Sequence, residues 1–174
     1  LPSSSEATDM QTAQDIVRLG AKETRIYPCI VVKDTVLEIM HNSGEYQALT
    51  IEDAVKRSAK LYSYFTENDV KVLRIGLHTS DELDSTAYVA GPYHKNFAEM
   101  VFSHIWKEKL TQALTQAQTQ TQTLTDIIIN VPESQINHAI GWKGENKKIL
   151  SEQFGNVIFK VNGQQTTDNR LCPH

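Results

Sequence analysis

Two short apolar runs, each following a helical pattern, constrain the fold of the first half of this chain. The first run, residues 26–32, reads IYPCIVV, and the second, residues 70–77, reads VKVLRIGL. A run that is rich in β-branched residues and almost continuously apolar is typical of a strand buried on both faces of a parallel sheet. The alternation of helix and strand patterns therefore predicts an α/β layer with parallel strands.

Helical patterns surround these predicted strands. Apolar residues recur on one side of residues 10–19, as in an amphipathic helix. A second helix is expected over residues 50–69, where Thr50 and Asp53 form a capping-box-like start. Such a cap typically stabilises a helix by about 1 kcal/mol. A further long helix is predicted over residues 96–114.

A low-complexity stretch divides the chain. Residues 111–125 read TQALTQAQTQTQTLT, a composition typical of a solvated linker, although alternating Thr also suits an edge strand. We therefore expect residues 1–110 to form one module and residues 126–174 to form another. Residues 78–97, within the first module, predict a loop because Gly and Pro interrupt them.

The second module has a pattern of its own. We predict a strand over residues 126–132, a short helix over 133–140 and a tight turn over 141–144. A second helix over 145–154 and a second strand over 156–161 follow. The sequence therefore predicts a small βααβ lobe, followed by a frayed end.

Net charge, cysteine spacing and apolar runs indicate which classes of protein this chain can belong to. The net charge of −4 argues against a general nucleic-acid-binding surface, although it leaves room for a local basic site. Cys29 and Cys172 lie far apart and fit no metal spacing, so we expect two unpaired thiols and no metal. No signal peptide and no apolar run of about 20 residues is visible, which predicts a cytoplasmic protein. The chain begins without Met, and we expect it to be a fragment.

Several blocks of the first module occur in the order of a known family. The family pattern before a helix is a strand ending in Tyr-Pro, an apolar run, a basic residue, Thr, Leu and Gly-x-Tyr. The matching residues here are Tyr27, Pro28, Lys33, Thr35, Leu37, Gly44 and Tyr46. The pieces RIGL and AGPYH follow, and the opening Leu1-Pro2 matches the remnant of a Gly-Leu-Pro-Gly turn. Over about residues 1–105, the chain resembles the radical S-adenosylmethionine domain of the elongator catalytic-subunit family.

The resemblance implies a fold and a chemistry. It implies the C-terminal half of a (βα) radical-SAM-type barrel, in which a 4Fe–4S cluster reduces S-adenosylmethionine to give a deoxyadenosyl radical. In the elongator group it implies modification of a wobble uridine in tRNA, with an acyl donor from coenzyme A. The cluster needs several thiolates at a defined CxxxCxxC spacing, which this sequence lacks. We therefore expect the missing N-terminal barrel half to supply cluster and cofactor, and this chain alone to bind neither and to be inactive.

The sequence also departs from the family pattern. Asp34 stands where the family has Gly, Ser3 replaces the second Gly of the opening turn, and Lys95-Asn96 replaces a Pro-Ala pair. A Gly at the position of Asp34 often marks a positive φ, which Asp tolerates only moderately. These departures raise the alternative of a degenerate paralogue with no cluster.

Five side chains are candidates for a pocket that binds S-adenosylmethionine or substrate. In an α/β barrel the site forms at the C-terminal ends of the strands, where we place Tyr27, Lys33, Arg74, His78 and His94. An Arg inside an apolar strand needs a partner, so an internal ion pair is the alternative for Arg74. Ordinary loop histidines are the alternative for His78 and His94, because no HxxxH or HxH spacing is present.

A second resemblance concerns the tail. Its centre, IGWKG, satisfies the Ile-Gly-x-x-Gly loop of K-homology RNA-binding modules, in which such a loop clamps about four nucleotides. The resemblance and the nearby lysines imply an RNA-binding set of Gly141, Trp142, Lys143, Gly144, Lys147 and Lys148. A packing lobe without RNA contact is the alternative, and Trp142 is then an ordinary loop aromatic.

The sequence leads to one preferred function and one runner-up. The preferred interpretation is the C-terminal portion of a radical S-adenosylmethionine enzyme that acts on tRNA or another RNA. The alternative is a non-catalytic RNA-binding or scaffolding module. We expect RNA and the missing barrel half as partners, and self-association through the exposed edge of the half-barrel.

Overall fold

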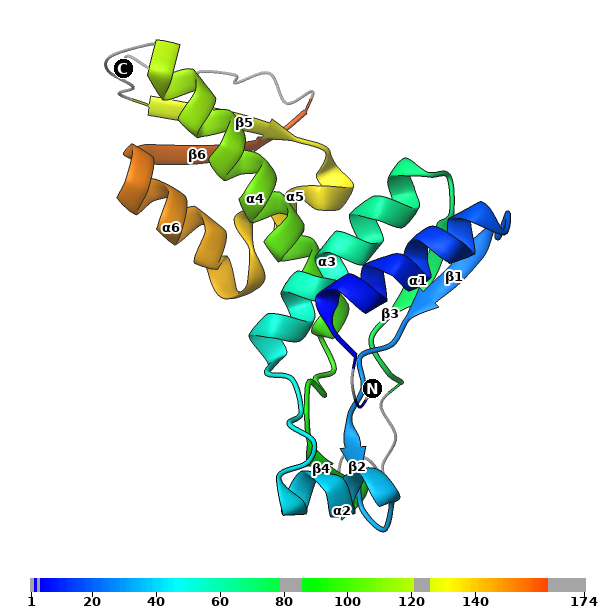
Figure 1. Ribbon diagram of the computed structural model, residues 1–174. Helices are drawn as coiled ribbons and strands as arrows, with labels where there is room; N and C mark the ends of the chain where they lie inside the picture. The colour runs from blue at the N-terminus through cyan, green and yellow to red at the C-terminus, as the bar shows by residue number, and fades with distance from the viewer. Residues whose placement is uncertain (1, 3, 79–85, 121–125, 163–174) are drawn as a thin grey trace, which may run out of the picture. The chain divides into compact units, whose positions relative to one another are not determined.

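The chain divides into two compact units, Leu1–Ile105 and Trp106–His174 (Figure 1). The computed structural model describes residues 2, 4–78, 86–120 and 126–162. The expectations for Leu1, Ser3 and Cys172 therefore lie outside the described residues. Each of the three sheets formed by the described part of the chain has two strands, so this part forms no closed barrel. No helix in these ranges is long and apolar enough to cross a membrane.

Unit 1 is built on a parallel strand pair. Strand β1 (Glu23–Ile26) pairs with β3 (Lys71–Ile75), and helix α3 (Ile51–Glu67) lies between them in the chain. Helix α1 (Glu6–Arg18) packs beside α3. The βαβ order and the parallel pairing confirm the α/β layer predicted from the two apolar runs.

The core of unit 1 lies where α1, α3 and the first part of α4 (Phe97–Gln120) meet the strand pair. Its buried members are Ala13, Ile26, Ala54, Val55, Ala59, Phe65, Val70, Ile75, Phe97, Val101 and Ile105. Thr50 caps α3 as predicted, because its hydroxyl accepts a hydrogen bond from the Asp53 amide at 3.0 Å. Two polar contacts also join α1 to α3, Asp9–Arg57 and Glu6–Lys60.

A β-bulge decides which strand residues face this core. Thr24 pairs with Val72 and Arg25 with Arg74, so Leu73 is the extra residue in β3. Beyond the bulge Ile75 is buried, whereas Arg25 and Leu73 are exposed. The prediction of strands buried on both faces is therefore wrong. Helices cover one face, and the other carries exposed or half-buried side chains.

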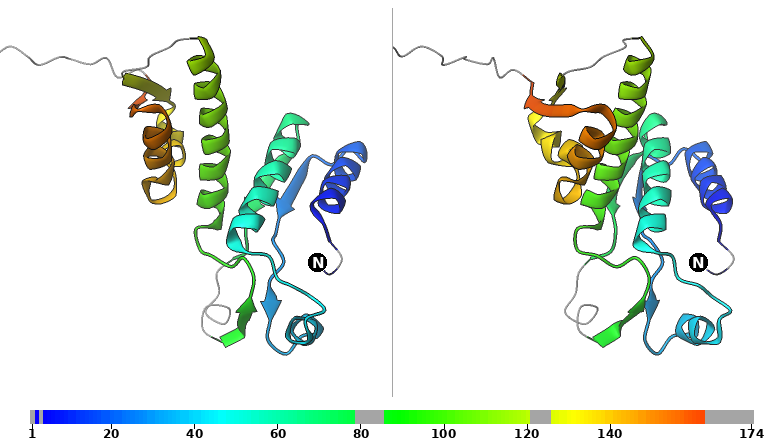
Figure 2. Two further views of the ribbon diagram at one scale, coloured as in Figure 1. Left: turned by 60° about the vertical axis from the view of Figure 1, so that its left-hand side comes forward. Right: turned by 90° about the vertical axis from the view of Figure 1, so that its left-hand side faces the viewer.

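The first apolar run forms two strands instead of one. Strand β1 ends at Ile26, and β2 (Val31–Val32) pairs antiparallel with β4 (Tyr88–Ala90), inside the stretch predicted as a loop. Pro28 has no amide hydrogen to donate to a ladder, which explains why the chain leaves the parallel sheet at this point. Figure 2 shows β2, β4 and helix α2 (Val36–Ser43) together beyond the end of β1.

Helix α4 extends farther than the sequence predicted. It continues to Gln120, so the prediction of a linker or edge strand is wrong for residues 111–120. Gln is a good helix former, and Leu110 and Leu114 are buried in the core of unit 2, so packing and propensity both favour helix. Residues 121–125 lie outside the described ranges.

Unit 2 has the predicted βααβ order. Strands β5 (Asp126–Val131) and β6 (Asn156–Val161) are parallel and in unbroken register. Between them lie, in chain order, the 3-10 turn η2 (Glu133–Gln135) and the helix α5 (Ile136–Ile140). The 3-10 turn η3 (Trp142–Gly144) then leads into the helix α6 (Glu145–Phe154). The buried core consists of Leu110, Leu114, Ile127, Leu150, Phe154 and Val157.

The departure at Asp34 has a structural consequence. Asp34 has φ of 60°, the left-handed region in which glycine is favoured. Its backbone N–H donates to Glu38 Oε2 at 2.7 Å, and the Glu38 amide donates to Thr35 Oγ1 at 3.2 Å, which fixes the start of α2. Asp34 therefore holds a glycine-type conformation that its hydrogen bond to Glu38 supports.

Replacement of Asp34 by glycine is expected to stabilise unit 1. The Asp34→Gly variant keeps the N–H that Glu38 accepts and removes the Cβ that disfavours positive φ, so the free energy of unfolding should rise by about 0.5–1 kcal/mol. Lys56→Gly, at an exposed position inside α3, is the control and should lower it by about 1 kcal/mol. Urea denaturation measures the free energy of unfolding of both variants. A loss of stability in Asp34→Gly would contradict the assigned strain.

Candidate functional site

One cavity of about 350 Å³ brings together two of the predicted site residues. It is lined by the C-terminal part of β3, by the residues that precede α4 and by the first turn of α4, and it contains Arg74, His94 and Lys95. The end of a parallel strand is where the barrel resemblance placed the site. The structure thus gathers Arg74 and His94 into one location from separate parts of the sequence.

Hydrogen bonds to the backbone orient both side chains. Arg74 Nε donates to the carbonyl oxygen of Gly76 at 3.1 Å, and Arg74 Nη2 donates to that of Leu77 at 3.3 Å. The internal carboxylate partner considered for Arg74 is absent among the described residues, and these carbonyls take its place. The Nδ1 atom of His94 accepts the backbone N–H of Asn96 at 3.0 Å, which leaves Nε2 to carry the proton of the neutral ring.

The other three predicted residues are not in this cavity. Lys33 and His78 are exposed and line neither of the two cavities described here. The Lys33 backbone N–H donates to the carbonyl of Ala87 at 2.8 Å, so its main chain extends the β2–β4 pairing. Tyr27 lies on the rim of a second cavity and is 48% exposed. The five predicted residues therefore do not form a single site within unit 1.

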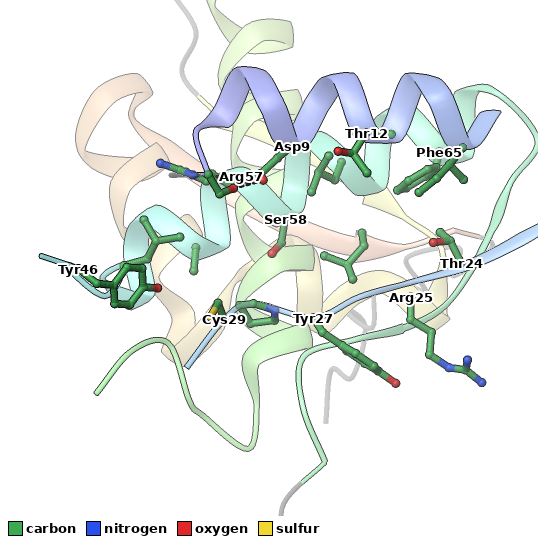
Figure 3. Close-up of a pocket in the computed structure, with 18 of the residues that line it drawn as sticks. Asp9, Thr12, Thr24, Arg25, Tyr27, Cys29, Tyr46, Arg57, Ser58 and Phe65 are labelled. Carbon is green, nitrogen blue, oxygen red and sulfur yellow. Dashed lines mark hydrogen bonds and ion pairs between the residues drawn. The ribbon is translucent and has the colours of Figure 1, made fainter. Parts of the chain in front are cut away.

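The second cavity, of about 480 Å³, lies along β1 between α1 and α3 (Figure 3). Its walls are mostly apolar and include Ala13, Ile16, Ile26, Leu49, Leu61 and Phe65. At one end lie Asp9 and Arg57, whose Oδ2 and Nη1 atoms are 3.3 Å apart. Figure 3 shows the side chains of Arg25 and Tyr27 turned away from α1.

Tyr46 lines this cavity but was not among the predicted site residues. Burial and, to a smaller extent, the neighbouring Cys29 raise the pKa of Tyr46 to about 12, while the charge of Arg57 acts in the opposite direction. Tyr46 belongs to the Gly-x-Tyr piece of the first resemblance, and Cys29 lies in the apolar run of β1 and β2. That motif was the signal for Tyr46, but only the fold brings the tyrosine beside Cys29 and Arg57.

The side chains of this chain do not fit an iron–sulfur cluster. Such clusters are held by several cysteine thiolates, and Cys29 is the one cysteine in the described part of the chain. Within those residues, no three His, Cys, Asp or Glu side chains come together as a metal site. The described residues of unit 1 therefore supply too few thiolates to hold such a cluster.

The GWKG loop of unit 2 has a conformation that depends on glycine. Gly141 has φ of 93° and Gly144 has φ of 77°, and between them Lys143 also has a positive φ of 54°. A Cβ on Gly141 would lie 2.5 Å from the Cγ of Asn146, whereas a Cβ on Gly144 would meet nothing within 4 Å. The first glycine is thus required by close packing, and the second leaves the outer surface of the loop open.

Lysine side chains surround this open surface. Lys143, Lys147 and Lys148 are exposed, and none of them forms an ion pair with another described residue. The Lys143 Nζ atom lies 5.8 Å from the centroid of the half-buried Trp142 ring, within the range of a cation–π contact. The predicted RNA-binding residues therefore do lie together, on one loop and the first turn of α6.

Comparison with known families decides the identity of the first unit. The model of the Radical_SAM C-terminal domain matches residues 21–107, which is half of the chain. This chain belongs to the radical SAM C-terminal domain family. A radical SAM protein of full length uses S-adenosylmethionine and an iron–sulfur cluster. Searches of curated proteins and of solved structures gave no match.

The family match covers the strand pair and every lining residue of the cavity at the end of β3. It begins before β1 and ends within α4, so it includes Tyr27, Arg74 and His94 but none of the GWKG loop. Unit 1 is thereby assigned as the C-terminal domain of a radical SAM protein. The role of unit 2 depends on its own geometry.

In the radical SAM C-terminal domain, Tyr46 should ionise late. The unfolded pKa is about 10, and the folded pKa of Tyr46 is about 12. The fold favours the neutral phenol, so the stability that Tyr46 contributes is complete below pH 10 and is lost as pH rises toward 12. Ultraviolet absorbance of tyrosinate against pH measures this step.

Two variants provide the controls for this titration. Tyr46→Phe should lack the late step, and Cys29→Ala should move it to lower pH because one of its causes is removed. Titration of all tyrosines together near pH 10 would contradict the burial of the Tyr46 phenol.

Proposed function

We propose that this chain is the C-terminal portion of a radical SAM enzyme that acts on tRNA or another RNA, and that the GWKG loop holds the RNA. The observation that carries the proposal is the open glycine loop with three exposed lysines at the start of α6. The elongator-type resemblance of unit 1 supports tRNA as the substrate class.

Phosphate contacts would supply the affinity. A glycine without neighbours at position 144 lets a sugar–phosphate chain approach the backbone closely, which is the use of such loops in K-homology modules. Ammonium groups of Lys143, Lys147 and Lys148 would pair with successive phosphates and release counterions. The exposed Glu145 beside them opposes this attraction and limits how tightly the loop binds anions.

Unit 1 would complete the catalytic barrel. Its uncovered sheet face and the free edges of β1 and β3 fit a partner barrel half that carries the cluster and S-adenosylmethionine. Arg74, near the C-terminal end of β3, and His94, in the same cavity, would then lie where barrel enzymes collect their substrates. Without that half, the same free edges favour self-association of this chain.

Charge reversal in the loop tests the RNA contact. Replacement of Trp142 and Lys143 by Asp places two carboxylates where the phosphates would lie. Affinity for a tRNA stem-loop should fall more than tenfold, or about 1.4 kcal/mol, as measured by fluorescence anisotropy. Binding by the unchanged protein should also weaken with increasing salt.

A double variant with the same charge change serves as the control. Gln11→Asp with Lys56→Asp alters exposed positions of α1 and α3 in unit 1 and should leave the affinity close to that of the unchanged protein. Equal and weak binding by all three proteins would show that unit 2 is a packing lobe and that the proposal is wrong.

A further inference from the structure

A buried asparagine holds the GWKG loop in place from outside the motif. Asn146, in the first turn of α6, is 3% exposed. Its Nδ2 atom donates to the carbonyl oxygens of His138 and Ala139, each at 3.3 Å. These carbonyls belong to the last turn of α5, where a helix lacks amide donors for its final carbonyl groups. The Asn146 amide therefore caps α5 from the helix that follows it.

The glycine and the asparagine depend on each other. Gly141 has φ of 93° and ψ of 160°, a region that is essentially restricted to glycine. Its missing Cβ would lie 2.7 Å from the Asn146 backbone nitrogen and 2.8 Å from its Cβ. The chain passes directly over Asn146 at this point, so the asparagine reaches the α5 carbonyls only because residue 141 has no side chain.

We propose that Asn146 is a positioning residue that fixes the GWKG loop in its RNA-binding shape before RNA arrives. This inference rests on the proposed function, because it assigns a role within the same site. A loop ordered in advance loses less conformational entropy on binding, which raises affinity without a new contact. Asn146 itself is buried and uncharged, so it contacts no phosphate.

Amide hydrogen exchange and RNA binding together test the proposal. Within the loop, the Gly144 N–H donates to the Gly141 carbonyl at 2.9 Å, and the Gly141 N–H donates to that of Asn137 at 3.0 Å. In the Asn146→Ala variant both amides should exchange at least about tenfold faster, because the cap that holds the loop is lost. Affinity for a tRNA stem-loop should fall by about tenfold, with the salt dependence unchanged.

Two comparison variants separate positioning from direct contact and from stability. Lys143→Ala should weaken binding and reduce the slope of affinity against salt by about 1, while the exchange of both glycine amides stays as it was. Asn130→Ala, at an exposed position of β5, should change neither quantity. If Asn146→Ala loses its circular dichroism signal, Asn146→Ser keeps one donor and should show a smaller effect in the same direction.

The outcomes distinguish this inference from the proposed function. Unchanged exchange and unchanged affinity in the Asn146 variants would overturn the positioning role while RNA binding stands. If the unchanged protein binds no RNA, the proposed function fails, and a role of Asn146 in RNA binding fails with it. Faster exchange without any loss of affinity would also overturn the proposal, because the asparagine would then serve stability alone.

Discussion

The parallel pairing of β1 with β3 is the constraint on which the rest of unit 1 depends. Parallel strands need a crossover, and α3 provides it while its apolar face packs against the pair. The bulge at Leu73 lets Ile75 face the helices, and Arg74 lines the cavity at the end of β3. Arg74 donates there to the carbonyl oxygens of Gly76 and Leu77, just beyond the strand, which gives this cavity a polar side.

In unit 2, the close contact between Gly141 and Asn146 is the constraint on which the loop depends. The backbone at Gly141 lies against Asn146, and this contact ties the end of α5 to the start of α6. The loop between the helices is left to project, with Lys143 and Gly144 at its surface. A rigid inner side and an open, lysine-bearing outer side are the properties that a phosphate-binding loop needs, because order in advance and charge both favour binding.

Sequence patterns predicted what local chemistry determines. The cap at Thr50 and the βααβ order of the tail follow from residue types and spacing, and the positive φ at Asp34 follows from the glycine that the resembled family has at this position. Tertiary effects explain the failures. Pro28 divides an apolar run that periodicity reads as one strand, and burial of Leu114 keeps a Gln/Thr stretch helical. The contact between Asn146 and the α5 carbonyls, seven and eight residues earlier, gave no signal of its own.

Mapping of RNA contacts by nuclear magnetic resonance tests the central claim most directly. A tRNA anticodon stem-loop titrated into isotope-labelled protein should shift the backbone amides of residues 141–148 more than any others in unit 2. Those of β5 and β6 should move little, because their hydrogen bonds lie in the ladder away from the loop. A saturable response confined to the loop and the start of α6 is the predicted result. Saturable binding that leaves these amides unmoved would contradict the assignment of the RNA site.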